Sequence, residues 1–152
     1  MATLARLNAL AGTWRATYEL RGDPRFDADV PTAAVVSPIL GGTFVQITYT
    51  WTESGTPQEG LLLVGLDPDP GTVTVAWLDT WHNGNRMMIC AGTLLPDGGI
   101  DVFGTYPGRP GEADWGWRTR LEPADEAWTM RMFNVSPGGA EAPAVTAVYR
   151  RG

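Results

Sequence analysis

The sequence contains no lysine, one cysteine and one histidine, and each of these shortages excludes a class of chemistry. A single cysteine can form neither an internal disulfide nor a cysteine-cluster zinc site. A single histidine excludes a metal centre with several histidine ligands, so we expect no metal. All 11 basic residues are arginines, and 17 acidic residues bring the net charge to −6. We therefore expect no nucleic-acid partner, since phosphate binding needs clustered positive charge.

Long hydrophobic runs are also missing from this chain. No stretch approaches the roughly 18 apolar residues of a membrane-spanning helix, so we expect no membrane partner. The first residues, MATLARLNALAG, carry Arg6 in their middle and lack the continuous apolar core of a signal peptide. From this we expect a cytoplasmic location.

Glycine and proline, by contrast, are abundant, with 19 and 12 residues out of 152. They gather in short clusters such as Gly41-Gly42 and Asp67–Gly71, between stretches in which apolar residues alternate with polar ones. Alternation with Val, Ile, Thr and aromatic residues predicts strands, and the clusters predict turns. The predicted strands are Thr13–Leu20, Thr32–Leu40, Thr43–Thr52, Glu59–Leu66, Thr72–Thr80, Met87–Leu95, Ile100–Tyr106, Asp114–Leu121, Ala127–Val135 and Ala144–Arg150. Leucines before them predict one helix, with Thr3 as its N-cap and Gly12 as its end.

These strands predict an all-β fold formed by a single domain, residues 1–152. Short connections favour antiparallel hairpins between consecutive strands. A sheet of about ten strands is expected to close into an up-and-down barrel, because closure removes both exposed edges. Such a barrel is either hollow around a ligand or filled by side chains. The longest predicted connection, Arg21–Val30, is interpreted as a surface loop or a lid.

The period of two assigns side chains to the two faces of each strand, and we place the bulkier face inside. In the strand near residue 77 this puts Trp77, Asp79 and Trp81 inside and His82 outside. Asp79 is the predicted polar anchor of a ligand, with a raised pKa because its carboxylate lies among indoles. The alternatives are a structural carboxylate, hydrogen-bonded to a neighbouring strand or to an arginine, and, if the two faces are inverted, a surface position. The other side chains predicted to line a ligand site are Tyr49, Tyr106, Trp117, Met130 and Met132, with His82 at the rim.

Two predicted strands, 59–66 and 87–95, are apolar on both faces. A strand of this kind needs a cover on its outer side, which the N-terminal helix or a second subunit could provide. We expect a homodimer. Cys90, in the second of these strands, is expected to be chemically inert, since it lies in an apolar strand and a reactive thiolate needs positive surroundings.

The entry to the first strand carries Gly12-Thr13-Trp14, which resembles the glycine-x-tryptophan signature of lipocalin-type (calycin) barrels. In that family the tryptophan closes one end of the barrel and packs against an arginine from the last strand. The resemblance implies a structural set of Gly12, Trp14 and Arg150 or Arg151. Physically, this set is a cation–π contact between the first and last strands.

Further blocks along the chain resemble a bacterial family of uncharacterised lipocalin-like barrels, a domain of unknown function structurally near nitrobindin and fatty-acid-binding proteins. The blocks are Pro38–Phe44, Gly60–Asp67, Trp77–Thr80 and Gly92–Leu94, and the resemblance runs from residue 10 to 150. It implies the barrel fold, and it brings no settled activity with it.

The sequence also departs from both neighbouring families. Nitrobindin-type barrels hold haem through a histidine on a late strand, whereas here no histidine follows His82, so we expect no haem and no other cofactor. Fatty-acid-binding proteins insert two helices between their first strands, and the connection Arg21–Val30 is too short for them. They also bind a carboxylate through late-strand basic residues, and the alternation places Arg118, Arg120 and Arg131 outside.

Three functions are compatible with the sequence. The first is a barrel that binds a small hydrophobic or aromatic molecule. The second is a cofactor-free isomerase, cyclase or hydratase in which Asp79 works with Tyr106 or His82 as acid and base. The third is a packed, dimeric interaction module without a ligand.

Overall fold

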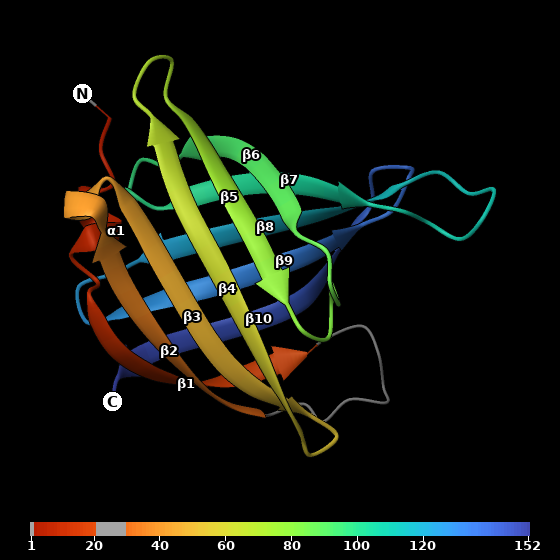
Figure 1. Cartoon of the computed structure of the whole chain (residues 1–152), viewed down its shortest axis with the longest axis horizontal. Helices are drawn as coiled ribbons and strands as arrows, with labels where there is room; N and C mark the ends of the chain where they lie inside the picture. Colours follow the sequence, from red (N-terminus) through yellow and green to blue (C-terminus); the bar gives the residue numbers. More distant parts are fainter. Residues whose placement is uncertain (1, 21–29) are drawn as a thin grey trace.

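A computed structural model of the chain describes residues 2–20 and 30–152, and in this part ten antiparallel strands form a closed barrel (Figure 1). Each strand pairs with its neighbours in sequence, and β1 pairs with β10 to close the ring. The strands are β1 (Gly12–Leu20), β2 (Val30–Ile39), β3 (Phe44–Glu53), β4 (Thr56–Asp67), β5 (Thr72–Asp79), β6 (Met88–Leu94), β7 (Ile100–Tyr106), β8 (Trp115–Pro123), β9 (Ala127–Val135) and β10 (Glu141–Arg151), with a 3-10 turn, η1 (Leu40–Gly42), between β2 and β3. The predicted fold class is confirmed.

The two ends of the barrel differ. Helix α1 (Ala5–Asn8) lies at one end, and the β5–β6 and β7–β8 connections lie at the other (Figure 1). We call these the closed end and the mouth. The predicted connection Arg21–Val30 lies, apart from Val30, outside the described residues.

The N-terminal helix is shorter than predicted, and its boundaries were wrong. It has one turn, its N-cap is Leu4 without a side-chain hydrogen bond, and Gly12 already belongs to β1. A single turn has little stability of its own. The hydroxyl of Thr3, the predicted cap, accepts a 3.3 Å hydrogen bond from the Ala5 N–H, and burial of Leu4, Leu7 and Leu10 in the barrel core holds the turn in place.

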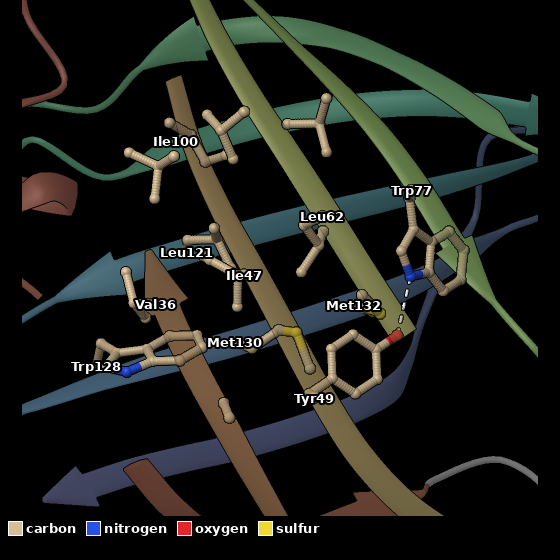
Figure 2. Close-up of a cluster of buried hydrophobic side chains, with 14 of the residues drawn as sticks. Val36, Ile47, Tyr49, Leu62, Trp77, Ile100, Leu121, Trp128, Met130 and Met132 are labelled. Atoms are coloured by element: carbon tan, nitrogen blue, oxygen red, sulfur yellow. Dashed lines mark hydrogen bonds between the residues drawn. The ribbon is translucent and has the colours of Figure 1, made fainter. Parts of the chain in front are cut away.

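The middle of the barrel is filled with side chains (Figure 2). The inward residues of successive strands meet there, and several have no accessible surface at all: Ile47, Leu62, Ile100, Leu121, Met130 and Met132. Side chains without accessible surface border no space that admits a water molecule. Around these residues the interior is therefore a packed core, and any ligand site must lie nearer an end.

Trp14 seals the closed end, as the signature implied. Its Nε1 donates a 2.8 Å hydrogen bond to the Leu10 carbonyl, and the Arg151 guanidinium carbon lies 3.9 Å from the centre of its ring. Arg151 also donates to the Ala11 carbonyl at 2.8 Å. The arginine of this contact is therefore Arg151 and not Arg150. The register explains the correction, since Trp14 lies opposite Arg151 while Arg150, one residue earlier, alternates to the other face and is exposed.

The outer faces of β4 and β6 stay partly uncovered. Met87 and Ile89 are each 59% exposed, and Leu61 and Leu63 are half-buried. The homodimer that would cover this face stays a prediction. Among the described residues, no helix has the length and apolar character needed to cross a membrane.

Candidate functional site

The turn that follows β5 shapes the mouth of the barrel. The Asp79 Oδ1 atom accepts hydrogen bonds from the backbone N–H groups of Trp81 and His82, both at 2.9 Å. The Asp79 carbonyl accepts a third from Asn83, also at 2.9 Å. A carboxylate that bonds to the backbone two and three residues later ends a strand and fixes a turn.

The alternation of inward and outward side chains along β5, from which we assigned Trp81 and His82 to opposite faces, stops at this turn. Because β5 ends at Asp79, the period of two no longer applies to Trp81 and His82. Trp81, predicted to point inward, is 40% exposed. His82, predicted to point outward, has a side chain only 11% exposed, packed over the barrel mouth. Both face assignments were wrong, because a turn rather than a strand sets these directions.

Asp79 is the centre of a buried hydrogen-bond network. Its Oδ2 accepts from the Tyr49 hydroxyl at 2.7 Å and from Trp51 Nε1 at 3.3 Å. The Tyr49 hydroxyl in turn accepts from Trp77 Nε1 at 2.9 Å, the bond drawn in Figure 2. His82 Nδ1 lies 3.1 Å from Oδ1, an ion-pair distance, without forming a regular hydrogen bond. The Asp79 side chain itself has no accessible surface.

These contacts keep the carboxylate ionised. Burial by itself raises the pKa of Asp79, but the adjacent His82 imidazole, the His82 backbone N–H and the bond from Tyr49 outweigh it, and the net pKa is lowered. The raised pKa that we expected for this carboxylate was wrong. Indole and phenol groups supply hydrogen-bond donors as well as apolar surface, and the donors decide the outcome.

Gly60 makes the contact between Tyr49 and Asp79 possible. The three residues form one cross-strand row, with Tyr49 opposite Gly60 on β4 and Gly60 opposite Asp79 on β5. A Cβ atom at Gly60 would lie 1.9 Å from Cζ of Tyr49. The missing side chain thus lets the phenol lie across β4. The sequence alone does not single out Gly60, since its role shows only in the register.

The imidazole of His82 is surrounded by indole rings. Its ring centre lies 4.8 Å from that of Trp81, 5.4 Å from Trp117, and 5.5 Å from both Trp51 and Trp77. Trp77 and Trp117 stack on each other at 5.1 Å. We call His82 and these four tryptophans the indole cage.

Two adjoining hollows open at the cage. The mouth pocket, about 320 Å³, is lined by Trp77, Trp81, His82, Asn83, Met88, Tyr106 and Trp117. The rim pocket, about 450 Å³, shares four of these residues and adds Arg86, Met87, Thr105 and Pro107. Volumes of this size suit one small molecule. Within the described chain, His82 Nε2 has no hydrogen-bond partner, and the Trp117 Nε1 is buried without one.

The structure brings together most, but not all, of the residues predicted for the site. Tyr106 lines the mouth pocket, but its hydroxyl bonds to Asn134 rather than to Asp79, and burial raises its pKa. Met130 and Met132 lie deeper, in the packed core, and border neither hollow. Burial also raises the pKa of the Cys90 thiol to about 11, in keeping with an inert cysteine.

A groove of about 420 Å³ runs outside the wall formed by β3, β4 and β5. Outward side chains such as Thr48, Thr50 and Leu61 line it, and the Asp79 backbone borders it while the carboxylate stays buried. The buried Asp79 carboxylate and the His82 imidazole lie on the other side of this wall, so we place the candidate site at the mouth.

The described residues do not offer a metal or haem site. No group of three or more His, Cys, Asp and Glu side chains comes together among them. The chain's only histidine directs Nδ1 at Asp79 and is enclosed by the indole cage. The absence of haem therefore stays a prediction.

Comparisons with known proteins place the chain in a family. No curated protein matches the sequence. The crystal structure of Rv2717c from M. tuberculosis is similar, with a TM-score of 0.66 and 15% identity over 98% of this chain and 96% of that one. At this identity the likeness shows the barrel fold alone. Residues 2–151 match the family described as a protein of unknown function, DUF1579. The match spans nearly the whole chain, and the protein therefore belongs to the DUF1579 family.

Proposed function

We propose that this protein is a calycin-like binding barrel that holds a small, mainly apolar or aromatic molecule at its mouth rather than in its interior. The observation that carries the proposal is the indole cage beside two hollows, with unpartnered nitrogens on His82 and Trp117. Stacked indoles offer a flat apolar wall, and a few polar groups fix a ligand's orientation. The filled core argues against a ligand deep in the barrel.

The first experiment is native mass spectrometry of protein purified from its own host. We expect a small molecule to co-purify with the protein, and its mass identifies the chemical class of the ligand. Repeated preparations that yield only bare protein, together with no hit in a broad metabolite screen, overturn the proposal.

A second experiment locates the site by titration with a neutral aromatic probe, 2-naphthamide. Its binding is measured by tryptophan fluorescence. We expect saturable quenching that is lost in Trp81→Ala, because Trp81 lines the mouth pocket and is partly exposed. Trp128→Phe is the matched control, since Trp128 is buried against Trp14 at the closed end. Equal binding by both variants argues against the mouth as the site.

A second candidate function is acid–base catalysis by His82 without a cofactor. The Asp79 carboxylate, held ionised and 3.1 Å from Nδ1, orients the imidazole and leaves Nε2 to exchange a proton with a bound molecule. Asp79 has no accessible surface and acts as a positioning residue. Deuterium incorporation into a panel of enolisable ketones in D₂O tests this. Wild type is expected to exceed His82→Gln and Asp79→Asn, and equal rates reject it.

A ligand-free dimeric module is the remaining alternative. The exposed side chains of Ile89 on β6 and of Met87, just before β6, favour this alternative. Light scattering across a range of protein concentrations measures the oligomeric state of wild type and Ile89→Glu. A dimer that Ile89→Glu dissociates, in a protein that binds no probe, supports this alternative over the first.

A further inference from the structure

We infer that the ligand of the mouth carries an anionic group, a carboxylate on an aromatic or aliphatic body, and that Arg86 binds this group. The inference rests on the proposed function, since it names the ligand class of the same site.

The lining of the mouth and rim pockets is free of acidic side chains among the described residues. This is unexpected in a chain with 17 acidic and 11 basic residues. The ionisable side chains that border the hollows are those of Arg86, His82 and Tyr106. Tyr106 stays neutral because burial raises its pKa. The ionised Asp79 carboxylate lies 3.1 Å behind His82 but has no accessible surface, so the permanent charge in the lining of the two hollows is the Arg86 guanidinium.

Arg86 is also unpaired, unlike several other arginines of the chain. The ion pairs of the described residues use Arg6, Arg118, Arg120 and Arg131. Arg86 is exposed, and neither an ion pair nor a hydrogen bond of its side chain occurs within the described part of the chain. A guanidinium that is free and forked is suited to a carboxylate, which it can bind through two parallel hydrogen bonds.

The position of Arg86 fits a ligand with a polar head and an apolar body. The rim pocket, which contains Arg86, shares His82, Met88 and Tyr106 with the mouth pocket, which contains Trp77 and Trp117. An apolar body packed on the two stacked indoles would thus leave its head near the guanidinium. Arg109 is a weaker candidate, because the neighbouring hollow of about 490 Å³ in which it lies also holds Glu112.

The experiment compares two probes of nearly equal shape, 2-naphthoate and its neutral amide, 2-naphthamide, by calorimetry and tryptophan fluorescence. We expect wild type to bind the carboxylate about tenfold more tightly than the amide, as one charge-assisted contact would give. Arg86→Gln is expected to remove this preference while amide binding stays unchanged. Arg150→Gln, an exposed arginine at the closed end, is the matched control and is expected to keep the preference.

The outcomes separate this inference from the proposed function. Equal binding of both probes by wild type, or a preference that survives Arg86→Gln, overturns the anionic ligand and leaves a neutral aromatic ligand at the mouth. Failure of both probes to bind overturns the inference and counts against the proposed function as well. Circular dichroism of each variant checks that the barrel is intact.

Discussion

Tyr49 donates a hydrogen bond of 2.7 Å to Asp79, although the two residues belong to β3 and β5 and β4 lies between them. The phenol crosses the intervening strand above Gly60, whose missing side chain leaves the space. The ionised Asp79 is thereby tied to the wall of the barrel on one side and to the His82 turn on the other.

Tyr49→Phe is expected to destabilise the protein by about 1–3 kcal/mol, because it leaves both the Trp77 N–H and one Asp79 lone pair without a partner. Tyr149→Phe is the matched control, since the Tyr149 hydroxyl makes one buried bond, to Thr32 at 3.0 Å. Urea denaturation measures both variants. A larger loss in Tyr149→Phe than in Tyr49→Phe contradicts the network described above.

Gly60→Ala is expected to cost about 2–3 kcal/mol, because the new methyl group displaces the Tyr49 ring and with it the bond to Asp79. Gly138→Ala is the control, since the atom nearest a Cβ there is Ser136 Oγ at 3.9 Å. Urea denaturation gives the free energies, and near-ultraviolet circular dichroism reports the tryptophan environment. Unchanged stability in Gly60→Ala shows that Tyr49 does not depend on this gap.

The stability of the fold is expected to fall in acid through Asp79. Its pKa in the folded state lies below the value of 3.8 taken for the free side chain, so the unfolded chain binds the proton first as the pH drops. The stabilisation is complete above the unfolded pKa and is lost as the pH falls through the folded one. Asp79→Asn is expected to be less stable by about 2–3 kcal/mol near neutral pH.

The check is the free energy of unfolding at several values between about pH 6 and about pH 3. The wild-type curve is expected to fall more steeply than that of Asp79→Asn, which has no carboxylate to protonate at this position. Parallel curves mean that the acid sensitivity arises elsewhere.

The closed end offers a test of the contact between the first and last strands. Arg151→Ala is expected to destabilise the barrel by about 1 kcal/mol, since it removes the guanidinium over Trp14 and the bond to Ala11. Arg150→Ala is expected to change stability by less than about 0.5 kcal/mol, as exposed surface substitutions do. Equal losses in the two variants contradict the assignment of the contact to Arg151.

Haem binding is expected to be absent. Titration of the protein with haemin should give no stoichiometric Soret band, because the indole cage encloses His82 and its Nδ1 faces Asp79. The informative comparison is His82→Ala. A band that forms with wild type and disappears in this variant overturns the exclusion of haem.

Much of the fold could be predicted from the sequence because strand periodicity and turn residues are local signals. Alternation placed Tyr49, Trp77, Asp79 and Trp117 inside the barrel, and all four are buried. It failed at Trp81 and His82, where the strand had already ended. The helix predicted from the sequence was too long, because the length of the real helix depends on which leucines the barrel can cover.

By itself, then, the sequence determined a closed antiparallel barrel, the inward rows of its strands and the shortage of metal ligands. The tertiary structure alone decided that the core is filled, that Tyr49 reaches Asp79 across Gly60, and that His82 turns back into a cage of indoles beside Arg86. The physical reason is that periodicity fixes the face on which a side chain lies. Its partners across the barrel depend on strand register and on the turn at the mouth, which the whole chain sets together.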